Sequence, residues 1–581
     1  MPSLSNLRVY SHGSSTSAIH TPPTTGSPPG QTQPENSSSA SSVVEGVIFQ
    51  EPDVEVDLID GEQGSAAGMV ESRAGNEESK RNLRDQLRRT LSKKESSTDI
   101  SAFRRRYSGK AGSMQEIAHT PAEQYLPRQY FVLTDAGKPV FVSDQDANSD
   151  SVTSMLGVAQ ALVSIFLDDG DKLRTINAGN MRIVFLLRPP LYYVCVSSWG
   201  EPESVTRFHL EYLHLQILSV FSAEQLRRMF EQRRNFDLGR LLRGAEPLLY
   251  SLLSRLEWDL AMGTSSLHCL KLDPALRKCV ADILVPTSKI KDILYVIMIA
   301  QGRVITLVRP RKHSIHPSDL HILINTIHSP SILNNSATAS YLPVCLPKFN
   351  PSAFVNAYVM FLPRSDLQDA AKKPTSEADS ESVRSNPDEQ PANETASSNS
   401  SPSSSSTGRV PEIALVAVSG SADFELVRGW ADNTIHRLSH DSLLKNLNDA
   451  ISQGSTEYSV SNLSIPGLRH FIYKSRSHVQ ITMPLFEDPY DSPNEKRRLV
   501  TLYQTLYDAI HAKSGQEHTL KLQYIKTSQE SVMGWITQPF ELYIALSPRL
   551  PKSAAVNAAN AIARWVQKEE KQLFLRDAPV F

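Results

Sequence analysis

Cysteine is scarce in this chain of 581 residues, and no two cysteines form a C-x-x-C pair. The four cysteines are Cys195, Cys269, Cys279 and Cys345. Small secreted domains that depend on disulfides are far richer in cysteine. The sequence therefore favours a reducing compartment and excludes a disulfide scaffold.

Long apolar segments are also missing. The N-terminus has no apolar stretch typical of a signal peptide, and the longest apolar run, 293–300, is far shorter than the ~20 residues that span a bilayer. The charges nearly cancel, with 60 Lys and Arg against 62 Asp and Glu. We therefore expect a soluble, cytoplasmic protein with no nucleic-acid partner.

Sequence motifs of common enzymes are absent. The chain contains no G-x-x-x-x-G-K-[ST], no G-x-G-x-x-G and no G-x-S-x-G. The histidine cluster His313, His316 and His321 has spacings of three and five, not the i, i+4 spacing of a helical zinc site, and Pro317 interrupts it. We expect a solvated helix entrance there, and we predict no catalytic residue, no metal and no cofactor.

Two segments have the composition of disordered chain. Ser, Thr, Pro and Gly make up 24 of the first 40 residues and 20 of the 35 residues from 374 to 408. Such segments cannot bury enough apolar surface to offset the entropy of an unfolded chain. Without residues 1–124 and 374–408, the remainder corresponds to about three domains of ordinary size.

What is present is one order of elements that occurs three times: strand, strand, helix, strand, strand, strand, helix. In the first copy, a turn with Gly137 joins two apolar runs, and apolar residues then recur at helical spacing from 152 to 166. In the third copy, Ser492 and Glu495 form a capping box with Pro493 at the first helical position. In the second copy, one helix is predicted from 423 to 451.

These copies define the predicted domains. The boundaries are 1–124 for a disordered arm, 125–235 for the first domain, 236–286 for a helical connector, 287–455 for the second domain with a disordered insertion at 374–408, and 463–581 for the third domain. An insertion between two strands costs little, because loop-closure entropy grows slowly with loop length. The fold class is α/β in the α+β sense.

The predicted arm carries two segments of opposite charge. Residues 45–62 are acidic with interleaved apolar residues, and residues 80–110 are strongly basic, with Leu83, Leu87 and Leu91 four residues apart. A basic amphipathic helix with Arg84, Arg88 and Arg89 can bind an anionic membrane. Two alternatives remain: a solvated basic linker or nuclear-type address, and pairing of the two segments, or masking of a folded surface, under control of serine phosphorylation.

Several irregular strings resemble the vacuolar fusion protein Mon family, also called SAND proteins. The resemblance covers most of residues 125–576. The strings are 131–139 (FVLTDAGKP), 341–350 (YLPVCLPKFN), 468–475 (LRHFIYKS), 534–537 (GWIT), 540–543 (FELY) and 564–570 (RWVQKEE).

The resemblance implies three longin domains, each an antiparallel five-stranded sheet flanked by helices. It also implies a heterodimer with a Ccz-type tri-longin subunit, which acts as guanine nucleotide exchange factor for the vacuolar and late-endosomal Rab GTPase. Further implied partners are the early-endosomal Rab GTPase and an anionic phosphoinositide membrane. The implied location is peripheral, on late endosomes, multivesicular bodies, vacuoles and prevacuolar membranes, where endosomes and autophagosomes fuse with the vacuole.

An exchange factor of this kind needs a binding surface and no reacting group. We predict that the start of the first domain's first helix, with the loop before it, faces the Rab, because an exposed polar loop on a rigid sheet can contact a switch segment. The alternative for Met155 is a core position. The predicted Rab-facing residues are Asp144, Asp146, Asn148, Ser151, Ser154 and Met155.

Basic residues in the second and third domains are candidate contacts for lipid headgroups; the alternative is that they are ordinary solvated side chains. These residues are Arg309, Arg311, Lys312, Arg469, Lys474 and Arg476. For the whole chain, the alternative function is a longin adaptor or tether without exchange activity, and a hydrolase is a more distant third. A longin SNARE is disfavoured, because no heptad stretch or membrane anchor follows the last predicted helix.

Overall fold

The structure is a computed structural model that describes residues 126–144, 150–233, 235–286, 292–334, 338–362, 413–420, 423–516, 518–576 and 579–580. The predicted arm, with both charged segments and with Arg84, Arg88 and Arg89, lies outside the described residues. The insertion at 374–408 lies outside them too. All elements named below belong to the described part of the chain.

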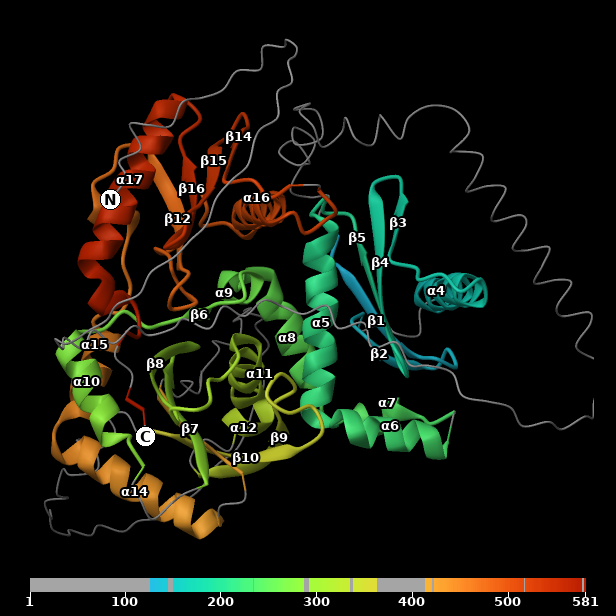
Figure 1. Cartoon of the computed structure of the whole chain (residues 1–581), viewed down its shortest axis with the longest axis horizontal. Helices are drawn as coiled ribbons and strands as arrows, with labels where there is room; N and C mark the ends of the chain where they lie inside the picture. Colours follow the sequence, from blue (N-terminus) through green and yellow to red (C-terminus); the bar gives the residue numbers. More distant parts are fainter. Residues whose placement is uncertain are drawn as a thin grey trace, which may run out of the picture. The chain divides into compact units, whose positions relative to one another are not determined.

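The predicted order of elements along the chain occurs three times, and the three sheets built from it repeat one spatial order of strands (Figure 1). The first sheet has the order β2-β1-β5-β4-β3, the second has β8-β7-β11-β10-β9, and the third has β14-β15-β16-β12-β13-β6. In each sheet the last strand of the repeat pairs antiparallel with the first, so the opening hairpin lies at one side of the sheet.

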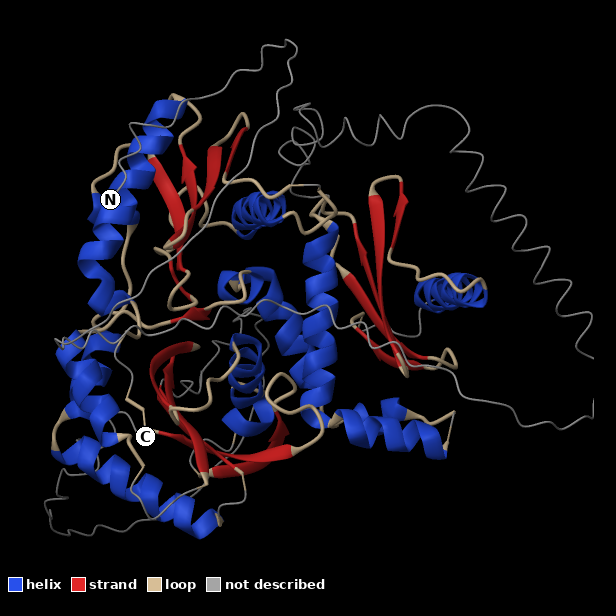
Figure 2. Ribbon diagram, in the orientation of Figure 1, coloured by secondary structure: helices blue, strands red, loops and turns tan. Residues whose placement is uncertain are grey.

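The first domain is a sheet between two helices, with α4 on one face and α5 on the other (Figures 1 and 2). Alternate residues of β1 point to opposite faces: Phe131 and Leu133 pack toward α4, and Tyr130 and Val132 pack toward α5. The glycine of the predicted hairpin turn, Gly137, has a φ of +80°, as its position requires. The elements are β1 (Gln129–Thr134), β2 (Pro139–Val142), α4 (Asp150–Asp168), β3 (Thr175–Ala178), β4 (Met181–Arg188), β5 (Leu191–Ser197) and α5 (Glu203–Val220).

The second domain repeats this arrangement around a sheet that is buried on both faces. Strands β10 and β11 flank the insertion and pair directly, with Phe361 opposite Ala414, so the insertion joins the ends of two neighbouring strands. The elements are β7 (Ile293–Ala300), β8 (Arg303–Val308), α11 (Pro317–Ile327), α12 (Pro330–Leu333), β9 (Ser340–Cys345), β10 (Phe354–Phe361), β11 (Ile413–Ser419), α14 (Phe424–His440) and α15 (Leu443–Ser452).

The single helix predicted from 423 to 451 is wrong. The chain forms two helices, because α14 ends at a C-cap on Asp441 and the next residue, Ser442, has a φ of +58°. A residue in the left-handed conformation cannot continue a right-handed helix. The residues at 439–442 (Ser-His-Asp-Ser) are polar, so the helix can end there without the loss of a buried apolar contact.

The third domain has α16 on one face of its sheet and α17 on the other (Figure 1). Half of the predicted capping box of α16 is confirmed: the Ser492 hydroxyl accepts a hydrogen bond from the Glu495 amide at 3.3 Å. The Ser492 amide donates to the Asp491 carboxylate and not to Glu495, so the reciprocal bond is not formed. The elements are β12 (Leu468–Ser475), β13 (Gln480–Thr482), α16 (Pro493–His511), β14 (Leu522–Lys526), β15 (Ser531–Ile536), β16 (Phe540–Leu546) and α17 (Lys552–Leu573).

The connector between the first and second domains is mainly helical, as predicted, but it also contains a strand that the sequence did not indicate. This strand, β6, pairs in parallel with β13 and extends the sheet of the third domain. Directly after it, the backbone of Cys269 forms an isolated parallel β-bridge with Val304 of β8 in the second domain. Helix α6 (Ala223–Gln232) precedes the connector, within the range predicted for the first domain. The elements of the connector are α7 (Leu238–Leu242), α8 (Glu246–Trp258), α9 (Leu260–Gly263), β6 (Leu267–His268) and α10 (Pro274–Ile283).

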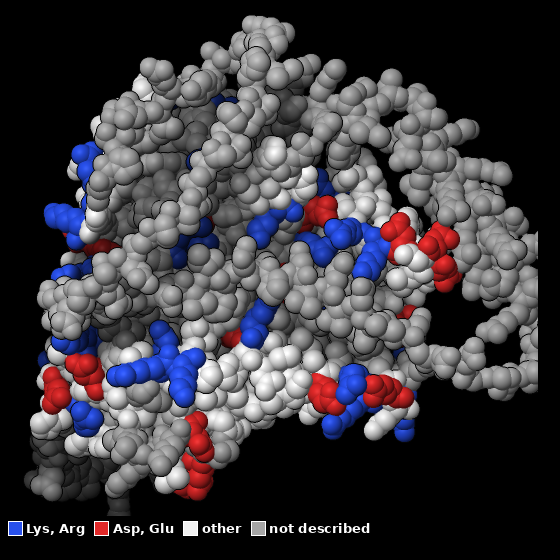
Figure 3. Space-filling model, viewed as in Figure 1, with Lys and Arg blue, Asp and Glu red and all other residues white. Residues whose placement is uncertain are grey.

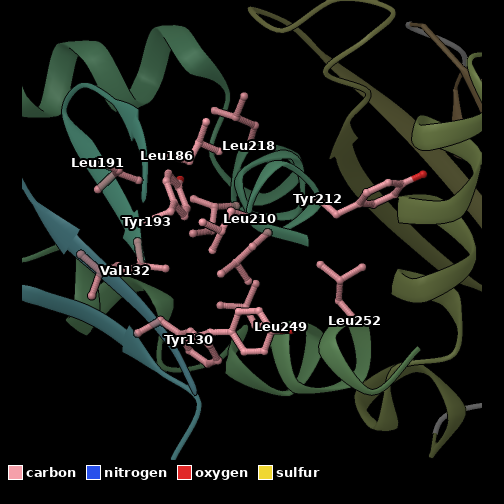
Figure 4. Packing of buried hydrophobic residues seen from close by; sticks show 14 of the residues in the cluster. Tyr130, Val132, Leu186, Leu191, Tyr193, Leu210, Tyr212, Leu218, Leu249 and Leu252 are labelled. Carbon is pink, nitrogen blue, oxygen red and sulfur yellow. The ribbon is translucent and has the colours of Figure 1, made fainter. Parts of the chain in front are cut away.

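Helix α5 also belongs to an interface between the first and second domains. Leu210 and Leu218 of α5 lie with Tyr193 of the sheet in one buried cluster, whereas Tyr212 points the other way, toward the second domain (Figure 4). That cluster includes Ile322 of α11. The same interface also contains a buried hydrogen bond of 2.9 Å, which the Asn325 side chain of α11 donates to the Gln216 side chain of α5.

Candidate functional site

Helix α4 begins where the sequence predicted the Rab-facing surface. Asp144 follows β2 and is half-exposed, and Ser154 is exposed on the first turns of α4. Met155 is half-buried and packs against the core, which agrees better with the alternative of a core position than with a Rab-facing one. Asp146 and Asn148 lie outside the described residues, as does the side chain of Ser151.

The exposed face of α4 has no charged side chain except the aspartates at its two ends. Between Asp150 and Asp168 the helix has no acidic or basic residue. Val158 is 51% exposed, and no neighbour lies within 4 Å of the position that a Cβ of Gly157 would take. Leu167, which is 41% exposed, lies nine residues further along and therefore on the opposite side of the helix. A surface helix normally carries charged residues on its outer face, so this face has the composition of a contact surface for another protein. We call it the α4 surface.

The sheet holds α4 rigidly on its inner side. Val152, Ala159 and Val163 of α4 are buried against Phe185 and Val194 of the two central strands. Gln160 also lies 3.5 Å from the carbonyl oxygen of Asp135 in the hairpin turn and donates to it. The α4 surface is therefore presented on a fixed platform, and a partner that binds it does not have to order it first.

The basic residues expected to contact lipid differ in their surroundings. Arg311 and Lys312 are exposed in the loop that follows β8, and Arg309 is half-buried beside them. Arg469 and Arg476 of the third domain donate to the carbonyl oxygens of Gln529 and Thr537. On the face shown in Figure 3, the described Lys and Arg side chains form several separate groups.

Lys474 does not face solvent, in contrast to its expected role as a headgroup contact. Its side chain is 12% exposed, its ammonium donates to the carbonyl oxygen of Thr264 at 3.0 Å, and the carboxylate of Glu541 is 3.5 Å away. Burial lowers the pKa of Lys474, and Glu541 opposes that shift. The sequence could not show this, because Lys474 and Glu541 become opposite neighbours only when β12 pairs with β16.

The histidine cluster is also only partly as expected. His313 is exposed, and His316 caps α11 by accepting a hydrogen bond from the Ser318 amide. His321, however, is buried: one ring nitrogen contacts the Ser266 carbonyl oxygen at 2.8 Å, and burial lowers its pKa. The expectation of a solvated site was therefore wrong for His321. Within the described ranges, no group of three potential ligand side chains is placed to bind a metal ion.

Comparison with known proteins gives matches for all three domains. Family models described as the first, second and third longin domains of FUZ, MON1 and HPS1 match residues 128–252, 291–378 and 467–570. The repeated strand order described above is therefore that of three longin domains.

Curated relatives with the same name cover most of the chain. A vacuolar fusion protein MON1 of Cryptococcus neoformans is 48% identical over 467 residues, which are 80% of this chain and 67% of the relative. This chain belongs to the MON1 family. The MON1 of Mycosarcoma maydis is 32% identical over 79% of this chain and 69% of its own length, and MON1 homolog A of Gallus gallus is 32% identical over 77% and 72%.

The match to the MON1 family extends over all three longin domains, so the α4 surface lies in a region that its members share. Within the described part of the chain, no helix combines the length and the apolar character that crossing a bilayer requires.

Proposed function

We propose that this chain is one subunit of a heterodimeric guanine nucleotide exchange factor that pairs with a Ccz-type tri-longin subunit and acts on the vacuolar and late-endosomal Rab GTPase. The observation that carries the proposal is family membership over all three longin domains, with relatives that are named vacuolar fusion proteins. In this role the chain promotes fusion of endosomes and autophagosomes with the vacuole.

The chemistry of nucleotide exchange requires no reacting side chain. An exchange factor binds the nucleotide-free GTPase more tightly than the loaded one, and by reciprocity the nucleotide is then held more weakly. Each ~1.4 kcal/mol of this difference accounts for a factor of ten in affinity. A surface on a helix that packs against its sheet, such as the α4 surface, suits this task, because binding energy is not spent on ordering it.

The deciding measurement is the release of fluorescent GDP from the late-endosomal Rab in the presence of the purified heterodimer. We expect the heterodimer to accelerate release strongly over the rate of the Rab alone. An intact heterodimer that leaves the rate unchanged would contradict the exchange-factor proposal and favour the adaptor or tether. Binding of the early-endosomal Rab can be measured with the same preparation by its retention on the immobilised heterodimer.

The α4 surface is tested by a charge on its exposed apolar side. We expect Val158→Asp to weaken either pairing with the partner subunit or GDP release about tenfold or more, because a charge buried at an interface costs binding energy. Leu426→Asp is the matched control, since Leu426 is 58% exposed on α14 of the second domain. Equal behaviour of the two variants would remove the α4 surface from the proposal.

Membrane recruitment is proposed for the exposed basic residues only. We expect Arg311→Ala with Lys312→Ala to reduce flotation with liposomes that contain phosphatidylinositol 3-phosphate, and the loss should be smaller at high salt, where screening already weakens binding. Replacing Arg84, Arg88 and Arg89 by Ala tests the arm in the same assay. Unchanged flotation would show that the residues concerned are ordinary solvated side chains that do not bind the membrane.

A further inference from the structure

The loop between β5 and α5 brings the first domain into contact with α16 of the third domain through an alternating series of cations and rings. Two guanidiniums lie over the Trp199 ring: the Arg128 Cζ is 3.7 Å from the ring centroid, and the Arg497 Cζ is 4.2 Å from it. The series continues through Trp258 and Lys496. Its members, in order, are Arg128, Trp199, Arg497, Trp258, Lys496 and Phe486, and we call them the cation–ring series.

Three parts of the chain supply this series. Arg128 and Trp199 belong to the first domain, Trp258 ends the connector helix α8, and Lys496 and Arg497 lie in the first turns of α16. The Arg497 Cζ is 5.5 Å and the Lys496 Nζ is 5.1 Å from the Trp258 ring centroid, and Lys496 is 4.4 Å from the ring of Phe486. The contacts therefore join elements that are more than 200 residues apart in the sequence.

Each guanidinium beside Trp199 has its own carboxylate, so two cations can share one indole. Arg128 forms an ion pair of 2.8 Å with Glu201, and both side chains are 2% exposed. Arg497 lies 3.8 Å from Glu257 of the connector. Cation–ring contacts are strongest when they are desolvated, and Trp199 is only 4% exposed.

Two hydrogen bonds anchor the same loop further. The Ser204 hydroxyl at the start of α5 donates to the carboxylate of Asp508, near the other end of α16. The Trp199 indole donates to the carbonyl oxygen of Leu126, where the described first domain begins. The loop thus contacts both α16 and the residues at which the N-terminal arm joins the domain.

This interface differs in kind from the one between the first and second domains. The latter includes a buried hydrophobic cluster that contains residues of both domains. Among the described residues, no hydrophobic cluster includes members of both the first and the third domain. Polar and cation–ring contacts therefore carry the contact to the third domain, and such a contact can open while the hydrophobic interface stays closed.

We propose that the cation–ring series is an interdomain latch, which holds the first longin domain against the third and so sets the orientation of the α4 surface. The second half of this statement rests on the proposed function. If the third domain responds to a membrane, the latch connects that response to the exchange surface.

The test is hydrogen exchange of the full-length chain in its heterodimer, with Arg497→Gln as the main variant. We expect the backbone amides of 126–134 and 197–204 to exchange about tenfold faster, because the cation–ring contacts of Arg497 with Trp199 and Trp258 and one ion pair are lost. Amides of 212–217, at the interface with the second domain, should be unchanged. The matched control is Arg564→Gln, since Arg564 is exposed on α17 and donates a hydrogen bond to the carbonyl oxygen of Asn560 in its own helix.

A second variant, Trp199→Phe, keeps a ring but loses the indole donor, and we expect a smaller acceleration in the same peptides. If both variants exchange at the rate of Arg564→Gln in these peptides, the latch is overturned. It is also overturned if the amides of 212–217 exchange faster too, because the substitution would then loosen the whole chain and not one interface.

The link to function is measured as GDP release by the same heterodimers. We expect Arg497→Gln to change the release rate at least threefold relative to Arg564→Gln. An unchanged rate with opened peptides would overturn the link to the α4 surface. If the wild-type heterodimer releases no GDP, the proposed function fails, and the hydrogen-exchange result still decides whether the latch exists.

Discussion

A glutamate in the third domain illustrates how one buried charge is compensated by its neighbours. Glu541 has a side chain that is 3% exposed, yet it accepts hydrogen bonds from His511 at 3.1 Å and Tyr543 at 3.2 Å. Burial alone would raise the pKa of Glu541, but the hydrogen bond from His511 and the charge of Lys474 lower it to about 2. The ionised carboxylate is therefore the form that stabilises the fold.

This shift predicts a pH dependence for the third domain. Because the folded pKa of about 2 lies below the value of 4.5 for an unperturbed glutamate, the stabilisation is complete above pH ~5 and is lost as the pH falls toward 2. We expect Glu541→Gln to lose on the order of 3 kcal/mol of unfolding free energy at pH 7, and less at pH 3. Urea unfolding at both pH values measures this.

The control for that prediction is Glu425→Gln, because Glu425 is 71% exposed and 3.9 Å from its nearest cation. A difference between wild type and Glu541→Gln that stays constant from pH 7 to pH 3 would show that the carboxylate charge is not the source of the stabilisation.

At the scale of elements, Gly534 on β15 permits the close approach of α16 to its sheet. A Cβ at this position would lie 2.5 Å from Ile510 Cδ1 and 3.3 Å from Leu506 Cβ. We expect Gly534→Ala to destabilise the third domain by about 1–3 kcal/mol, as overpacked core substitutions do, measured by urea unfolding.

The matched variant is Gly429→Ala. Gly429 lies in α14 with open space around the position of a Cβ, so alanine should stabilise this helix by about 0.5–1 kcal/mol. Opposite signs for the two substitutions are expected, and a stabilising effect of Gly534→Ala would contradict the packing argument.

Local sequence signals predicted the elements well, because each signal acts within a few residues. The turn at Gly137 and the cap at Ser492 were both found from the sequence. Strand β6 was missed, because two residues carry no periodicity and the strand exists only through its pairing with β13. The break at Ser442 was missed because neither glycine nor proline marks it, and apolar residues resume at Leu443 and Leu444 directly after the polar stretch.

The candidate site divides in the same way. The position of α4 was predictable, whereas the burial of Lys474 and His321 depends on partners that are distant in the sequence. Net charge and histidine spacing contain no information about such partners.

At the scale of the whole molecule, Arg277 of α10 fixes the C-terminal segment to the connector. Its buried guanidinium donates to the carbonyl oxygens of Lys571, Gln572 and Phe574 at the end of α17, and to that of Leu270. These include terminal carbonyl groups of a helix, which have no partner within the helix itself.

We therefore expect Arg277→Ala to release the segment after α17. Hydrogen exchange at 572–576 should become at least tenfold faster, because several buried acceptors lose their donor. Lys278→Ala, at the exposed neighbouring position, is the control. If the amides of 572–576 exchange at the same rate in both variants, then Arg277 does not hold the segment in place.

Leu575 completes the hydrophobic cluster of the second domain, together with residues such as Cys269 from the connector. On the ribosome, Leu575 is made only after the entire third domain. Leu575 follows the last helix of the second domain, α15, by some 120 residues. We therefore expect the core of the second domain to stay incomplete during translation, until this residue has been synthesised. Nascent chains stalled before residue 570 should leave the second domain more sensitive to protease than released full-length chains, and equal sensitivity would contradict this order of assembly.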